Sequence, residues 1–93
     1  MQERSAKTAL VTGAARGLGR AMALGLARAG HAVAAVDLAS SANELTELAA
    51  EARAANAAIT PITCDVTDFD QCKNAVNSAL STLGSIDILA RTG

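Results

Sequence analysis

The chain has 93 residues, and its nine acidic and eight basic side chains nearly cancel. This length allows one modest domain, and the even charge offers neither a basic stripe for nucleic acid nor a charged block for a membrane surface. No apolar run approaches the ~20 residues that span a bilayer, and residues 1–7 lack the apolar core of a signal peptide, so we expect a cytoplasmic protein.

The first apolar run, residues 9–11, predicts a buried parallel strand, and residues 12–20 follow it with three glycines. Gly13 would let the chain turn sharply off the strand, Gly17 would let the backbone approach a phosphate, and Gly19 would let a helix pack close to the sheet. Such a turn presents backbone N–H groups at the positive end of a helix dipole, which suits a diphosphate. Taken alone, the spacing is weak evidence, because a glycine-rich loop without a ligand has the same pattern.

The next segments alternate between helical and extended patterns. A first helix ends at Gly30, and a second strand at residues 32–36 ends at Asp37. Residues 41–44 form a capping box, which predicts the start of a second helix. The expected apolar face of the first helix is Leu18, Ala21, Met22, Gly25, Leu26 and Ala29, and that of the second is Leu45, Leu48, Ala49 and Ala52.

Residues 59–63 predict a third strand, which Pro61 confines to a sheet edge because proline cannot donate to a ladder. Residues 67–70 are expected to cap a third helix that Gly84 closes, and residues 86–90 predict a fourth strand. The expected apolar face of the third helix is Phe69, Cys72, Val76, Ala79, Leu80 and Leu83.

The order β-α-β-α-β-α-β predicts an α/β fold of the Rossmann type. Right-handed crossovers give a parallel sheet with helices on both faces, and the strand order 3-2-1-4 places the proline-bearing strand at an edge. We expect residues 1–93 to form the dinucleotide-binding portion of a single domain that is incomplete. Its fourth strand would then lie at an open apolar edge, which favours pairing with another chain or a homo-oligomer.

Three features meet at the carboxyl ends of these strands: the glycine turn, Asp37 and Asp65. Asp37 follows Gly19 by eighteen residues, the place of a carboxylate that accepts from ribose hydroxyls, and it would repel a 2′-phosphate. We therefore expect NAD rather than NADP, although Arg16 and Arg20 offer guanidinium groups that suit the extra phosphate. The alternative for Asp37 is a turn residue at a strand end.

Of the remaining polar residues, Asp65 has a functional and a structural interpretation, and the others have a structural one. Asp65 would accept from the adenine amino group, with the Val66 N–H near the ring, or would instead cap the next helix. His31 is interpreted as a surface residue and Asp87 as a turn residue far from the binding edge. Cys64 and Cys72 match no zinc spacing and are interpreted as small buried residues.

Together these residues resemble the short-chain dehydrogenase/reductase family. Residues 12–19 look like its TGxxxGxG cofactor motif, Asp37 resembles the acidic residue of its NAD-preferring members, and Asp65 with Val66 is similar to its adenine-contacting pair. The likeness covers residues 7–89 and implies an oxidoreductase that transfers hydride between a nicotinamide cofactor and a secondary alcohol or ketone. The cofactor-binding residues that it implies are Gly13, Arg16, Gly17, Leu18, Gly19, Asp37, Leu38, Asp65 and Val66.

The sequence departs from this family at its carboxyl end. The family follows the fourth strand with Asn-Asn-Ala-Gly, whereas residues 90–93 read Ala-Arg-Thr-Gly, and the 93 residues contain no tyrosine for the family's Tyr-x-x-x-Lys pair. We therefore expect no catalytic residue, no metal site and no turnover by this chain alone. The alternatives are a non-catalytic nucleotide-binding or interaction module and a Rossmann-type methyltransferase. The three residues between Gly13 and Gly17 argue against the methyltransferase.

Overall fold

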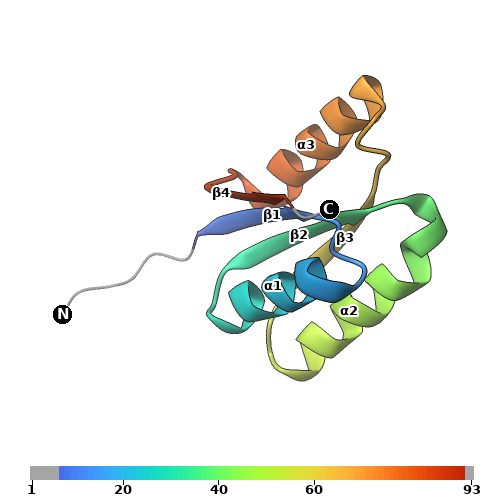
Figure 1. The fold of residues 1–93 in the computed structure, drawn as a ribbon. Coiled ribbons are helices and arrows are strands. Elements are labelled where there is room, and N and C mark those ends of the chain that lie inside the picture. Colours follow the sequence, from blue (N-terminus) through green and yellow to red (C-terminus); the bar gives the residue numbers. More distant parts are fainter. Residues whose placement is uncertain (1–6, 92–93) are drawn as a thin grey trace.

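The computed structural model describes residues 7–91, which form a parallel sheet covered by helices on both faces (Figure 1). In chain order the elements are β1 (Thr8–Thr12), α1 (Gly17–Arg28), β2 (Ala32–Asp37), the 3-10 helix η1 (Ala39–Ser41), α2 (Ala42–Ala54), β3 (Ile59–Thr63), α3 (Phe69–Leu83) and β4 (Ile88–Arg91). The predicted alternation of strands and helices is confirmed.

The four described strands pair in the order β3-β2-β1-β4, and every pair is parallel. This confirms the predicted order, with the proline-bearing strand at one edge, where the Pro61 side chain is exposed. The register aligns the carboxyl ends of the strands, since Thr12 lies opposite both Val36 and Arg91. Side chains that follow these strands therefore meet at one edge of the sheet.

The two faces of the sheet are covered unequally. Helices α1 and α2 cover one face and α3 covers the other (Figure 1). Successive residues of a strand point to opposite faces, so Val11 packs under α1 and α2 while Leu10 faces α3. The first core holds fully buried leucines, Leu45 and Leu48, whereas α3 contributes only the small buried residues Ala75 and Ala79.

The predicted apolar face of α1 is wrong for most of its residues, although Leu26 packs against the core. Gly25 is exposed with open space where a side chain would stand, and Leu18 is 70% exposed. The helix is rotated from the predicted orientation, so its buried residues are Gly19, Ala23, Leu24 and Ala27. Alanine and glycine are so frequent in this helix that several faces look equally apolar in the sequence.

The two predicted helix starts have different outcomes. Asp68 caps α3 as expected, because its carboxylate accepts from the backbone N–H groups of Asp70 and Gln71 at 3.0 and 3.2 Å. Ser41 precedes α2, but its side chain makes no capping hydrogen bond. Its hydroxyl is buried and accepts a hydrogen bond from Arg16 instead. The capping box is therefore wrong in its chemistry, although α2 begins where it predicted and buries the predicted face.

The predicted buried face of α3 is wrong in part. Phe69 is 79% exposed, and Val76 and Leu80 are also exposed, whereas Ala79 is buried and Cys72 is half-buried. Strand β4 begins two residues later than predicted and extends to Arg91. The last two residues of the predicted departure, 92 and 93, lie outside the described residues. Within the part that the structure describes, no helix is long and apolar enough to cross a membrane.

Candidate functional site

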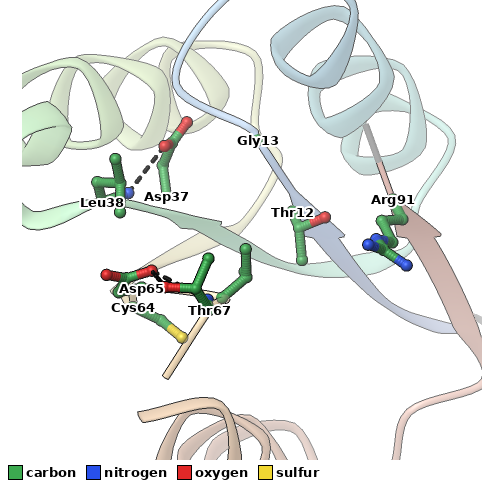
Figure 2. A pocket seen from close by; sticks show the side chains of 9 residues that line it. Thr12, Gly13, Asp37, Leu38, Cys64, Asp65, Thr67 and Arg91 are labelled. Atoms are coloured by element: carbon green, nitrogen blue, oxygen red, sulfur yellow. Dashed lines mark hydrogen bonds between the residues drawn. The ribbon is translucent and has the colours of Figure 1, made fainter. Parts of the chain in front are cut away.

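A pocket of about 260 Å³ lies at the carboxyl ends of the strands (Figure 2). It is lined by Thr12, Gly13, Asp37, Leu38, Cys64, Asp65, Val66, Thr67 and Arg91. Ligands of open α/β sheets bind at this edge, where the strand order reverses between β1 and β4. The volume is below the ~300–1,000 Å³ of sites that enclose a drug-sized ligand, so the pocket fits one part of a longer molecule.

The turn between β1 and α1 has the backbone that its glycines predict. Gly13 and Gly17 have φ angles of 66° and 64°, a left-handed conformation that other residues adopt only under strain. The Ala14 N–H donates to the Val36 carbonyl at 3.1 Å, which ties the turn to β2. No side chain caps the first turn of α1, which holds no acidic residue. Its N–H groups and dipole therefore favour an anion.

Asp37, the last residue of β2, holds the turn and η1 in place. One carboxylate oxygen accepts from the Ala15 N–H at 2.9 Å, and the other accepts from the Leu38 N–H at 2.8 Å (Figure 2 shows the second bond). Each oxygen of an ionised carboxylate has a further lone pair, so both still accept from an incoming hydroxyl. The carboxylate is thus fixed beside the glycine turn and retains capacity for a ligand.

The two arginines near the turn have different partners. Arg16 donates to the buried Ser41 hydroxyl at 3.1 Å, which places its guanidinium at the start of α2. Arg20 forms an ion pair with Glu51 of α2. Arg20 therefore links two helices, whereas Arg16 lies beside the loop that follows Asp37.

The loop after β3 carries Asp65 and is tied to the neighbouring strand. The Cys64 N–H donates to the Asp37 carbonyl at 2.8 Å. One Asp65 oxygen accepts from the Thr67 hydroxyl at 2.7 Å and from the Thr67 N–H at 2.9 Å (Figure 2). These two bonds, the hydroxyl's first, hold the pKa of Asp65 below its ordinary value. Asp65 is therefore ionised at neutral pH, and its hydrogen bonds with Thr67 stabilise the loop that carries it.

The structure brings five of the predicted site residues together around the pocket: Gly13, Asp37, Leu38, Asp65 and Val66. The other four, Arg16, Gly17, Leu18 and Gly19, belong to the turn and the first turn of α1 and do not line the pocket. Gly19 is buried, in keeping with the predicted close packing of the helix.

Sequence reasoning missed four residues that line the pocket: Thr12, Cys64, Thr67 and Arg91. Thr12 was part of the glycine motif, and its place at the end of a strand was a usable signal. Arg91 was interpreted only as a departure from the family pattern, yet within residues 7–91 it is the one cationic side chain that lines the pocket (Figure 2). Nothing in the local sequence marks Cys64 as a lining residue.

The residues given structural roles lie elsewhere. His31 accepts a hydrogen bond from the Lys7 N–H at 3.0 Å, and Asp87 accepts from the Thr8 N–H at 3.0 Å. Thr8 and His31 are at the amino ends of their strands, opposite the pocket. Across residues 7–91, the structure gathers no group of three or more metal-ligating side chains.

The model of one family, short chain dehydrogenase, matches residues 7–92. The chain is 38% identical over 83 residues to the 3-oxoacyl-(acyl-carrier-protein) reductase FabG of Staphylococcus aureus, covering 89% of this chain and 33% of that protein.

Two solved structures are similar to the chain. The hydroxysteroid dehydrogenase from Escherichia coli has a TM-score of 0.87 and 29% identity, covering 91% of this chain and 35% of that one. A blue fluorescent protein from a metagenomic library, in complex with NADPH, has a TM-score of 0.83 and 38% identity, covering 89% and 34%. The chain thus spans about a third of the length of these relatives.

Proposed function

Because the chain belongs to the short-chain dehydrogenase family, we propose that it supplies the dinucleotide-binding part of an NAD(P)-dependent oxidoreductase. The reaction would move a hydride between the nicotinamide ring and a secondary alcohol or ketone. The observation that carries the proposal is the meeting of the glycine turn, Asp37 and Asp65 in one pocket at the carboxyl ends of the strands. This is the place where an open α/β sheet binds its ligand.

The residues present fit the two charged or polar parts of a dinucleotide. The uncapped first turn of α1, with Gly17 at its start, suits the pyrophosphate. The Asp37 carboxylate has remaining acceptor capacity for the ribose hydroxyls, and Asp65 with Val66 would flank the adenine. The pocket has room for the adenosine half, with the rest of the cofactor extending along the turn.

We propose NAD as the preferred form of the cofactor. The Asp37 carboxylate is fixed beside the glycine turn, where it would face the ribose, and a negative charge there repels a 2′-phosphate. Arg16 offers a guanidinium for the opposite preference, but it donates to the Ser41 hydroxyl and does not line the pocket. Two structural relatives are complexes with NADPH, a polyketide ketoreductase and the blue fluorescent protein, so the proposed preference for NAD rests on the Asp37 carboxylate alone.

Binding of the two cofactors tests the proposal directly. Equilibrium dialysis of the purified chain with NAD and with NADP should give saturable binding, with the lower Kd for NAD. S-Adenosylmethionine serves as the control ligand, because a Rossmann-type methyltransferase would bind it instead. Absence of saturable NAD binding by a chain with the expected helix content would contradict the cofactor site. A lower Kd for NADP would contradict the assigned preference alone.

We also propose that the 93 residues alone do not turn over substrate. They contain no tyrosine, and a tyrosine beside a lysine is the general acid–base pair that the family resemblance implies. Incubation with NAD and a panel of secondary alcohols should produce no absorbance of reduced nicotinamide. Measurable reduction that follows the purified chain through a second column would overturn this part of the proposal.

A second role, pairing with another chain, is favoured by the edge of the sheet formed by β4. This strand has no partner on its outer side among the described residues, and its Leu89 side chain is 69% exposed. Light scattering should then show association of the chain, which Leu89→Lys should weaken. A monomeric chain at micromolar concentration would remove the support for this role.

A further inference from the structure

The two cysteines lie side by side in the fold although they belong to different elements. Cys64 follows β3, and Cys72 lies in the first turns of α3. Both side chains line one apolar cleft of about 130 Å³ between α3 and the sheet. The Cys72 sulfur is 3.4 Å from the Val66 carbonyl oxygen and 3.9 Å from that of Asp65, the two residues that come directly after Cys64. The two thiols therefore line the same cleft, one from the end of β3 and the other from α3.

The electrostatics of Cys64 agree with this contact. Burial raises the pKa of the Cys64 thiol, and a hydrogen bond that this thiol donates to Cys72, together with the negative charge of a Cys72 thiolate, raises it further. The nearby carboxylates of Asp65 and Asp68 act in the same direction. Cys64 is 3% exposed and Cys72 is half-buried, so a small oxidant from solvent meets Cys72 first.

We propose that Cys64 and Cys72 form a reversible disulfide that joins the end of β3 to α3. With a peroxide as oxidant, the Cys72 thiolate attacks one peroxide oxygen and becomes a sulfenic acid while the other oxygen leaves as water. The Cys64 thiolate then attacks the Cys72 sulfur and releases the second water, so that two thiols and one peroxide give one disulfide and two waters. The raised pKa of Cys64 makes this second step faster as the pH rises.

The place of the pair makes it a modification site with a consequence for the pocket. Cys64 lines both the apolar cleft and the pocket at the strand ends, and Asp65 and Val66 lie in the loop that the disulfide would close. Bond formation requires the sulfurs to approach to about 2.05 Å, so the proposal includes a movement of α3 toward the end of β3. Its first turns have few large buried side chains, since Phe69 is exposed and only Ala75 and Ala79 of the helix are buried. The helix is therefore free to adjust.

Mass spectrometry of the intact chain tests the proposal. After treatment with stoichiometric hydrogen peroxide at mildly alkaline pH, the monomer should lose two hydrogen atoms and accept no alkylating reagent at either cysteine. Cleavage before Asp65, Asp68 and Asp70 should leave the two cysteine peptides joined until dithiothreitol separates them. The single variants Cys64→Ser and Cys72→Ser should show neither the internal bond nor the protection.

Oxidation of Cys72 to a sulfinic acid with Cys64 still free would overturn the proposal, as would disulfides that form only between chains. A titration with glutathione redox buffers separates a pair assembled by the fold from two thiols that are merely close in sequence. The folded chain should keep its disulfide at a glutathione ratio at least about tenfold more reducing than the chain in concentrated urea. Equal ratios in the two conditions would also overturn it.

Discussion

Asp37 is the residue on which the assignment of the cofactor depends, because its carboxylate serves the fold and the ligand together. It accepts from two backbone N–H groups, those of Ala15 and Leu38, and so fixes the glycine turn against β2. The same charge would face the ribose of a dinucleotide. Asparagine keeps the shape and one acceptor oxygen but loses the charge and one of the two backbone bonds, so the ratio of the Kd values for NAD and NADP, rather than either Kd alone, reports the role of the charge.

Asp37→Asn should raise the Kd for NAD about tenfold, because an amide replaces a charged acceptor worth ~1.5–3 kcal/mol. The Kd for NADP should rise by a smaller factor than the Kd for NAD, or should fall, because the repulsion of the 2′-phosphate disappears. The preference for NAD over NADP should therefore become smaller. Asp87→Asn is the matched control, because Asp87 also accepts from a backbone N–H but lies at the amino end of the strands. Dialysis of both variants with both cofactors measures the effect. An unchanged ratio for Asp37→Asn would contradict the role of Asp37 in selection.

Thr67 controls the ionisation of Asp65 from two residues away. Its hydroxyl and its N–H both donate to one Asp65 oxygen and lower the pKa of that carboxyl. A lowered pKa in the folded chain favours folding above the carboxyl's ordinary pKa, and this advantage is lost as the pH falls through the lowered value. The contact therefore contributes to folding at neutral pH and not in strong acid.

Thr67→Val should move the pKa of Asp65 back toward its ordinary value, because it removes the hydroxyl, the larger of the two causes, and leaves the backbone bond. Thr67→Ser keeps a hydroxyl and should leave the pKa low. Carboxyl-carbon NMR titration of Asp65 in the three chains reads these values directly. If the valine variant titrates like the parent, the hydroxyl is not the cause of the shift.

At the scale of elements, α3 shows how a single cap supports a helix with little buried surface. The Asp68 carboxylate accepts from two N–H groups of its first turn and from the Gln71 side chain at 3.3 Å. The buried residues of α3 are both alanines, so packing stabilises this helix little. We therefore expect the cap to contribute a large share of the helix's stability.

Asp68→Ala should therefore lower the free energy of unfolding by about 1 kcal/mol, within the ~0.5–2 kcal/mol range for a lost N-cap. Asp68→Asn should cost much less, because asparagine is an equally good capping residue. Urea unfolding followed by circular dichroism measures both variants. Equal losses for alanine and asparagine would indicate that the charge of Asp68, and not its capping geometry, stabilises α3.

The elements also show which parts of the molecule the sequence predicts well. Strand order followed from Pro61 and from the crossover rule, and the binding edge followed from where Gly13, Asp37 and Asp65 stand relative to the strands. These inferences rest on proline, glycine and aspartate, residue types that are suited to few positions in a fold. The face of α1 was wrong because alanine and glycine do not distinguish its sides, and Gly25 turned outward.

Contacts between different helices and strands could not be predicted from local sequence patterns. The hydrogen bond from Arg16 to Ser41 joins residues 25 positions apart, and it displaced the capping box predicted for α2. The meeting of Cys64 with Cys72 depends on how α3 packs over the sheet, which spacing along the chain does not specify. Both contacts depend on tertiary packing, which the local sequence does not specify.

At the scale of the whole molecule, the two faces of the sheet differ in how much they bury. The face under α1 and α2 contains Leu45 and Leu48, both fully buried, together with inward-facing strand residues such as Val11 and Val33. On the other face α3 contributes only the small buried residues Ala75 and Ala79 and leaves Val76 and Leu80 exposed. Because hydrophobic stabilisation follows the apolar area removed from water, the first face should hold most of the stability.

We therefore expect α3 to open at a lower free energy than α1 and α2. Amide hydrogen exchange of the native chain should be faster through residues 72–83 than through residues 45–54, since regions with few large buried contacts open locally. Leu48→Ala should cost about 2–5 kcal/mol of stability, whereas Leu80→Ala should cost about 1 kcal/mol or less. Urea unfolding measures the two losses, and exchange rates read by NMR locate the opening. Equal protection of α2 and α3 would mean that the sheet unfolds with both faces at once, and a large loss for Leu80→Ala would place an unexpected share of the core under α3.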